Sequence, residues 1–467
     1  MIRTLIITTV VAAATLNAAA QSNDGGITPQ MLKDIAAQSN AATPAQKALS
    51  NAIQNNSIDV IAKGSGVRQE VPTKFSVETP KQSIMNQKSS GRCWMFSGLN
   101  VLRANFARQN EGKRVEFSQD YLFFYDQLEK ANLMLQACID LAGKPLTDPE
   151  VDFLFANPIS DGGTFCGIID LVAKYGLVPK SVVPETFTAE STSAMDKLLK
   201  RKLREDGLRL REMVSSKKKA SDIKAAKTEM LATIYRMLTM AYGVPPTEFT
   251  YTHRDKDGNP VGEAKTYTPL SFAKECGATG LDGNYIMLMN DPRHEYGKVY
   301  EIEYDRHTYD GHNWRYLNLP MEDIKALAIT ALKDGRKMYS SYDAGKYLDR
   351  PRGFASMQNY DYESLFQTSF PMTKAQRIET HDSGSTHAMT LTAVNIAADG
   401  KADYWKVENS WGSDSGQKGY MVMTDEWFDN FFFRLVIDKE YVPAATQKLY
   451  QQKPQMLKYD DALFEDQ

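Results

Sequence analysis

Apolar residues recur at helical spacing along the first half of the chain. A period near 3.6 residues places such positions on one face of a helix, and that face then packs against the rest of the protein. The pattern predicts helical structure in residues 87–125, 168–175 and 194–242, of which the last is the longest helical stretch. Gly176 directly follows the second range and is expected to end that helix.

From about residue 285 onward the pattern changes to short apolar runs that are typical of strands. Helices that come first and strands that follow favour an α+β architecture over one in which the two alternate. The expected strands are residues 285–289, 299–304, 337–342, 387–396, 404–408 and 419–424.

The first twenty residues have the layout of a secretory signal peptide. One basic residue, Arg3, precedes an uncharged stretch of about a dozen residues, and small residues stand at Ala18 and Ala20. We expect cleavage near Ala20 and export to the periplasm or the medium, the alternatives being an uncleaved anchor or a frayed helix. No later stretch reaches the roughly 18 apolar residues of a membrane span. Residues 21–70 are polar and are expected to form a lead-in with a short helix or two.

Composition narrows the class of protein without identifying its chemistry. The chain has 467 residues, of which 42% are hydrophobic and 24% charged, as in ordinary globular proteins. The net charge of −3 argues against a generally basic nucleic-acid binder. Residues 195–242, however, contain 13 lysines and arginines but only 6 acidic residues. Such a region can bind phosphates, but a solvated helical face is the favoured interpretation.

One cysteine stands in a context that suggests a nucleophile. Cys93 follows Gly91 and Arg92 at the start of the first predicted helix, where the helix dipole favours a thiolate. Gln87 lies six residues earlier, and its amide is a candidate donor to an oxyanion beside the thiol. A lone cysteine is usually a small buried hydrophobe, but this context favours catalysis.

Two later motifs supply the partners that a catalytic cysteine needs. His387 begins a predicted strand and is the candidate general base and acid. Asn409, in the segment Val407–Gly412, can orient the imidazole through its side-chain oxygen, and Trp411 can cover that hydrogen bond. Taken singly, the histidine is more often structural and the asparagine more often a turn residue.

The order Cys, His, Asn and the residues around it resemble the bleomycin hydrolase and aminopeptidase C family of papain-like cysteine peptidases. The resemblance rests on GRCWMFSGLN (91–100), THAM (386–389), VENSWG (407–412) and KGYMVMTDEWF (418–428). It continues between them in YTHRDKDGNP (251–260), YTPLSF (267–272), MNDPRHEYGKVYEIEY (289–304) and YDAGK (342–346).

The resemblance implies a papain-like fold, with a helical half and an antiparallel, barrel-like β half, over residues 71–467. A large, mainly helical insertion is expected at about 190–360 and a C-terminal arm at about 442–467. Cys93 is then the nucleophile, His387 the base, Asn409 the orienting residue and Gln87 part of the oxyanion hole. Substrate contacts are expected from Asp161, Gly162, Gly163, Trp411 and Gln467.

The family also implies partners. Members cleave peptides and assemble as homohexamers with active sites that face an inner chamber. Neither membrane nor nucleic-acid binding is expected for an exported, net-negative chain. No cofactor or metal is expected, because no zinc-ligand spacing and no dinucleotide fingerprint is present.

The C-terminal arm departs from the family pattern. In relatives its end blocks the far subsites and meets the substrate's amino group, which makes the enzyme an aminopeptidase. Here the end reads YDDALFEDQ (459–467), which is acidic and bulky. An acidic end can capture an ammonium group by charge, or it can be too large for the cleft. The sequence therefore leaves a cysteine aminopeptidase and, as the alternative, an endopeptidase with an open cleft. A non-catalytic binder of nucleic acid is the alternative from another class.

The remaining histidines and cysteines are expected to have no catalytic role. His307 and His312 lie in a segment rich in tyrosine and aspartate and are expected at the surface. Cys138, Cys166 and Cys276 allow at most one disulfide, and mostly free thiols are expected.

Overall fold

The computed structural model describes residues 25–39 and 43–464, in two units that comprise residues 1–62 and 63–467. The described part of the first unit contains helices α1 (Pro29–Ser39), α2 (Pro44–Asn55) and α3 (Ile58–Ile61). The predicted signal peptide, residues 1–20, lies outside the described residues. Among the helices of the described residues, none combines the length and the apolar character that crossing a bilayer requires.

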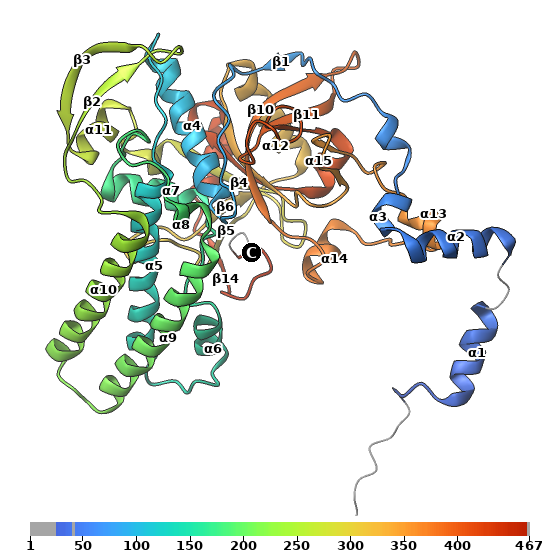
Figure 1. Ribbon diagram of the computed structural model, residues 1–467, viewed down its shortest axis with the longest axis horizontal. Coiled ribbons are helices and arrows are strands. Elements are labelled where there is room, and N and C mark those ends of the chain that lie inside the picture. Colours follow the sequence, from blue (N-terminus) through green and yellow to red (C-terminus); the bar gives the residue numbers. More distant parts are fainter. Residues whose placement is uncertain (1–24, 40–42, 465–467) are drawn as a thin grey trace, which may run out of the picture. The chain divides into compact units, whose positions relative to one another are not determined.

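A large mixed sheet organises the second unit (Figure 1). Its strand order is β14-β5-β6-β4-β13-β7-β10-β11-β12-β9-β8, and β1 pairs with β10 beside that path. The strands are β1 (Val77–Glu78), β4 (Tyr285–Met289), β5 (Val299–Ile302), β6 (Arg315–Asn318), β7 (Met338–Tyr342), β8 (Leu348–Asp349), β9 (Phe354–Ala355), β10 (His387–Ile396), β11 (Ala402–Glu408), β12 (Tyr420–Thr424), β13 (Phe432–Asp438) and β14 (Gln455–Leu457).

The strands at the centre of this sheet are buried on both faces, which explains their nearly continuous apolar runs. Helix α4 (Cys93–Gln109) packs against β10 and β7, whereas α12 (Met321–Lys333) packs against β1, β10 and β13. Two hydrophobic clusters result, one that contains α4 and one that contains α12. All six predicted strands are present, and the bounds of β4 and β10 are those expected.

A bundle of helices lies next to α4 (Figure 1). Helices α9 and α10 form a long hairpin that packs against α5 through buried leucine, isoleucine and methionine side chains. The helices of this part are α5 (Gln119–Asp140), α6 (Pro149–Ala156), α7 (Phe165–Tyr175), α8 (Phe187–Glu190), α9 (Ser193–Ser215) and α10 (Ala220–Tyr242). Gly176 caps α7, as the sequence predicts. Most helices precede most strands of the large sheet, which confirms the α+β class.

The remaining elements complete both halves of the unit. Within the range 190–360, residues 193–267 form α9, α10 and a two-stranded hairpin, whereas β4 to β7 belong to the large sheet. The other elements are the hairpin β2 (Phe249–Arg254) and β3 (Pro260–Tyr267), and the helices α11 (Pro269–Glu275), α13 (Tyr362–Phe366), α14 (Lys374–Glu379), α15 (Asp425–Phe431) and α16 (Ala444–Tyr450).

A buried charge cluster ties the two halves together beside Asn409. Glu408, the last residue of β11, accepts hydrogen bonds from Arg103 Nη2 at 2.7 Å and from Lys337 Nζ at 2.6 Å. Arg103 belongs to α4, Lys337 directly precedes β7, and all three side chains are buried. A buried cation without its counter-charge is costly, so this carboxylate fixes α4 and β7 to the end of β11.

We expect Glu408→Gln to lower the free energy of unfolding by about 3–5 kcal/mol, because two buried cations lose their counter-charge. Urea unfolding followed by tryptophan fluorescence measures this change. Glu229→Gln, at an exposed position of α10, is the matched control and should change the value by less than about 0.5 kcal/mol. A loss below about 1 kcal/mol in Glu408→Gln would contradict the assignment of this cluster as a stabilising one.

Candidate active site

The candidate nucleophile, Cys93, lies at the first position of a helix. Cys93 begins α4, is 4% exposed, and its Sγ accepts the backbone N–H of Ala388 at 3.5 Å. The turn before it depends on Gly91, because a Cβ there would lie 2.2 Å from Asp161 Oδ1. A close approach of this kind tolerates only glycine. The start of α4 and the start of β10 therefore meet at the thiol.

The imidazole is held by an amide from the neighbouring strand. His387 Nε2 lies 2.8 Å from Asn409 Oδ1, which also accepts the backbone N–H of Ser410 at 2.7 Å. Because the amide oxygen only accepts, Nε2 carries the proton, and Nδ1 is the nitrogen that can take a proton from a thiol. Asn409 thus fixes both the tautomer and the orientation of the ring.

The imidazole lies in an environment that favours its neutral form. Burial lowers the pKa of His387 to about 4. The hydrogen bond that His387 donates to Asn409 raises this pKa, and the nearby positive charge of Arg350 lowers it further. A neutral ring at physiological pH is the form that can act as a base.

Gln87 is oriented by two short hydrogen bonds. Its Oε1 accepts from Ser410 Oγ at 2.5 Å, and its Nε2 donates to the backbone carbonyl of Ser90 at 2.5 Å. An amide nitrogen has two protons, so the second is available to another acceptor. The backbone N–H of Gln87 also donates to the carbonyl of Ser410, at 2.8 Å. The glutamine is therefore locked in place before any substrate binds.

Trp411 stacks on the imidazole. The centroids of the His387 and Trp411 rings are 5.0 Å apart, with an interplanar angle of 29°. The indole thus covers the histidine beside its bond to Asn409, in the position the sequence analysis expects. The guanidinium carbon of Arg350 lies 4.2 Å from the centroid of the same indole. This arginine was not identified from the sequence.

The Asp161–Gly163 segment borders the same region, but its members differ in role. The carboxylate of Asp161 accepts the backbone N–H of Gly91 at 2.7 Å and also a hydrogen bond from Thr192, so it supports the nucleophile turn. The carbonyl of Gly162 accepts from Lys130 Nζ at 2.5 Å. A Cβ on Gly163 would lie 2.1 Å from the ring of His307, so this position too requires glycine.

The expectation for His307 is wrong, because this side chain is fully buried. Its Nδ1 lies 2.6 Å from Asp126 Oδ1, and its Nε2 accepts the backbone N–H of Thr164 at 3.1 Å. Its ring packs on Trp94, next to the nucleophile. Asp126 belongs to α5 and is 181 residues away in the chain, so no local sequence pattern predicts its pairing with His307. His312 is exposed, as expected.

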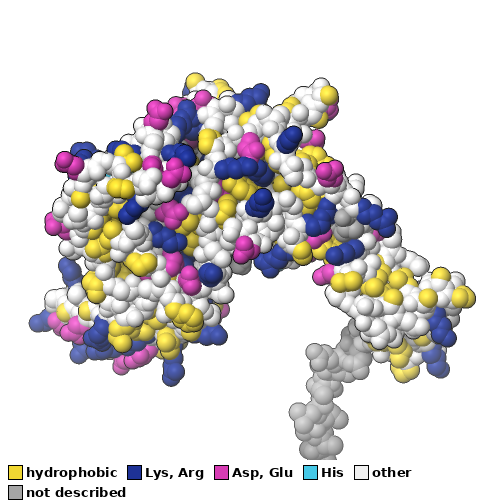
Figure 2. Space-filling model, turned by 45° about the horizontal axis from the view of Figure 1, so that its top comes forward, with side chains coloured by type: hydrophobic (Ala, Val, Ile, Leu, Met, Phe, Trp, Pro, Cys, Tyr) yellow, Lys and Arg dark blue, Asp and Glu magenta, His cyan; other side chains and the backbone are white. Residues whose placement is uncertain are grey.

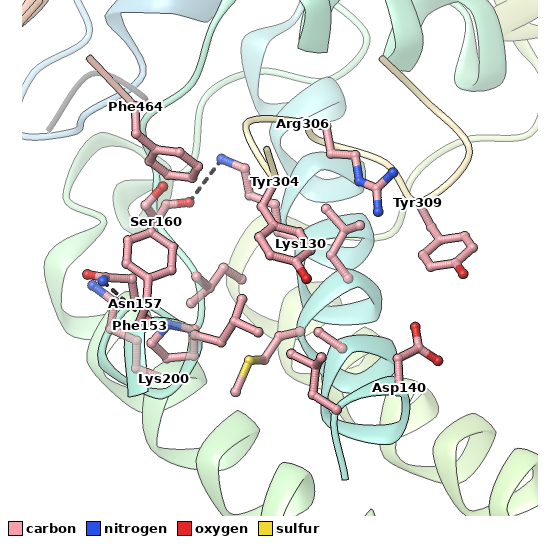
Figure 3. Close-up of a pocket in the computed structure, with 17 residues that line it drawn as sticks. Lys130, Asp140, Phe153, Asn157, Ser160, Lys200, Tyr304, Arg306, Tyr309 and Phe464 are labelled. Carbon is pink, nitrogen blue, oxygen red and sulfur yellow. Dashed lines mark hydrogen bonds between the residues drawn. The ribbon is translucent and has the colours of Figure 1, made fainter. Parts of the chain in front are cut away.

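The C-terminal arm lies next to Gly384 and lines one pocket together with Ser160. Gln467 lies outside the described residues, but Leu463 is buried, and its carbonyl accepts from Arg434 Nη2 at 2.7 Å. Phe464 and Ser160 line one pocket of about 420 Å³ (Figure 3). The ring centroids of Phe464 and Phe153 in this pocket are 5.4 Å apart. A Cβ built on Gly384, three residues before His387, would lie 3.9 Å from the carbonyl oxygen of Ala462.

The other chemical groups of the described residues are not assembled into a second centre. No group of three or more histidine, cysteine, aspartate or glutamate side chains there is placed to hold a metal ion. All four cysteines are free thiols, as expected. On the face that Figure 2 shows, lysine and arginine side chains are interspersed with acidic ones rather than gathered in one continuous basic surface.

Comparison with known proteins matches this geometry. Residues 26–463 match the model of the Peptidase C1-like family. Aminopeptidase C of Lactobacillus delbrueckii subsp. lactis is 40% identical over 87% of this chain and 90% of its own. Human bleomycin hydrolase is 38% identical over 86% and 90%. The crystal structure of PepW from Lactobacillus rhamnosis has 39% identity and a TM-score of 0.88, over 94% of this chain and 99% of that one. The chain therefore belongs to the Peptidase C1-like family and is a cysteine peptidase.

Proposed function

We propose that this protein is an aminopeptidase that releases N-terminal residues from peptides. The observation that carries the proposal is the site itself, in which Cys93, a neutral His387 and a preset Gln87 are held, with the C-terminal arm next to Gly384, three residues before His387. Relatives that match most of the chain are named aminopeptidase C, aminopeptidase W and aminopeptidase G, all from Lactobacillus delbrueckii subsp. lactis.

The reaction is an acyl transfer in two steps. Cys93 Sγ attacks the scissile carbonyl while His387 takes the thiol proton, and the resulting oxyanion receives hydrogen bonds from Gln87 and from the backbone N–H of Cys93. The C–N bond then breaks, His387 returns the proton to the leaving amine, and a thioester remains. Water adds to the thioester with His387 as the base, which releases the acid and restores the thiol.

The arm supports exopeptidase action over the endopeptidase alternative. Asp461 forms an ion pair with Arg293 at 2.9 Å, and Arg434 holds the carbonyl of Leu463. These contacts hold the arm beside Gly384 and in one pocket with Ser160, which directly precedes the Asp161–Gly163 segment, where the acyl part of a long substrate is proposed to lie. With that path occupied, only a short N-terminal portion fits between the arm and the thiol.

Two further properties belong to the proposal. Export after cleavage near Ala20 is supported by the layout of residues 1–20, and the mass of the protein recovered from the cell envelope tests it. Assembly as a homohexamer is supported by the family resemblance, and light scattering on the purified protein measures it. A non-catalytic nucleic-acid binder is disfavoured, because nothing in such a function requires a preset Gln, Cys, His and Asn set.

The aminopeptidase function predicts that peptides with a free N-terminal amine are cleaved and their N-acetylated counterparts are not. The reason is that acetylation removes the ammonium charge that the acidic end of the arm is proposed to capture and adds bulk on the side of the arm. Mass spectrometry of the products of matched peptide pairs measures this difference. Equal cleavage of both members would establish the endopeptidase alternative instead.

The matched control for the nucleophile is another buried thiol. Cys93→Ala should abolish turnover of these peptides, whereas Cys276→Ala should retain it, because Cys276 is buried away from the site and next to α11. Turnover at the normal rate in Cys93→Ala would exclude the proposed chemistry.

The pKa of His387 predicts the acid limb of the pH profile. The ring is neutral above pH 4 and loses its ability to accept the thiol proton as the pH falls through about 4. The value of kcat/KM should therefore stay high well below pH 6.5, the ordinary pKa of histidine, and fall about tenfold per pH unit below the limb. Intrinsic fluorescence at each pH separates this loss from unfolding. An apparent pKa near 6.5 in this profile would show that burial does not determine the pKa of His387.

A further inference from the structure

A second pocket borders the catalytic histidine. It has a volume of about 350 Å³, and His387 and Trp411 form part of its wall. Neither the arm nor the Asp161–Gly163 segment lines it. Because His387 delivers its proton to the leaving amine, the leaving peptide must lie against this ring. The complete lining consists of Ala344, Gly345, Leu348, Arg350, Thr386, His387 and Trp411.

Arg350 is the cationic side chain in the wall of this pocket. It directly follows β8, is exposed, and has its guanidinium against the indole of Trp411. Within residues 25–39 and 43–464, no carboxylate forms an ion pair with it. Neighbouring cations, in contrast, form ion pairs. Arg352 Nη1 lies 3.7 Å from Asp349 Oδ2, and Lys346 Nζ lies 3.1 Å from Asp382 Oδ1.

The stacking on Trp411 prepares Arg350 for an anion. A guanidinium that lies on an aromatic ring loses conformational freedom but keeps its N–H donors in the plane of the group, where they point outward. Those donors match the two oxygens of a carboxylate. The pocket is otherwise lined by small or neutral side chains, so no second charge competes for such a ligand.

We propose that Arg350 is a specificity-determining residue that binds a carboxylate of the leaving peptide. The proposal rests on the aminopeptidase function proposed above. The favoured substrates are then dipeptides, whose terminal carboxylate closely follows the scissile bond, or longer peptides with aspartate or glutamate shortly after that bond. Because Arg350 is exposed, the preference is expected to be roughly two- to fivefold in kcat/KM and to weaken as salt increases.

Two matched substrate pairs test the proposal and separate the two sources of the carboxylate. The first pair is Ala-Ala and Ala-Ala-amide, and the second is Ala-Asp-Ala-amide and Ala-Asn-Ala-amide. The full-length enzyme should prefer the acidic member of at least one pair roughly two- to fivefold at low ionic strength. In Arg350→Gln the ratio should fall to about one, whereas Arg350→Lys should retain part of it because the charge remains. Arg236→Gln, at an exposed position of α10, is the matched control and should leave both ratios unchanged.

Each outcome has a distinct meaning. A preference in the first pair alone identifies the terminal carboxylate as the ligand, and a preference in the second pair alone identifies the side chain. Turnover of all four peptides at ratios of about one would overturn the role of Arg350 and leave the aminopeptidase function intact. An equal loss for both members of a pair in Arg350→Gln would also overturn it, because Arg350 would then only support Trp411. Absence of turnover for all four peptides would overturn both proposals.

Discussion

Helix α4 meets strand β10 at Ala388, and the whole active site depends on that contact. Ser97 Oγ donates to the carbonyl of Ala388 at 2.9 Å, and Cys93 Sγ accepts its N–H at 3.5 Å. The two helical side chains are four residues apart and lie on one face of the helix. The carbonyl and the N–H of Ala388 therefore both fix the position of α4 along β10. Because His387 immediately precedes Ala388, the same contact sets the distance between thiol and base.

The second constraint is the segment that follows β11. Three consecutive residues hold two parts of the site, since Asn409 binds His387, Trp411 covers His387, and Ser410 binds Gln87. Glu408, directly before them, is fixed by two buried cations, one from α4 and one from the residue directly before β7. The segment is therefore anchored at its start and does not have to be ordered by substrate. A preorganised site of this kind spends little free energy on reorganisation during the reaction.

Much of this arrangement is predictable from the sequence because the signals are local. The buried strand β4 is a continuous apolar run, β10 is rich in apolar residues, and Cys93 begins a helix whose apolar spacing is clear. The interactions that escape prediction are between distant residues. His307 depends on Asp126, and Arg350 acquires its surroundings only when β8 is brought next to the end of β11. Ser410 lies inside a recognisable motif, yet its partner Gln87 is 323 residues away.

The two sides of the cleft are built differently, and this asymmetry links the fold to selectivity. On the side proposed for the acyl part, buried arginines hold the arm, and under the proposed function the arm limits how much of a substrate can precede the scissile bond. On the leaving side, small residues and one exposed arginine border an open pocket. A closed acyl side discriminates by length, whereas an open side can discriminate only through interactions with the leaving peptide. Any preference for substrate sequence after the scissile bond must then come from the few side chains there, and Arg350 is the charged one among them.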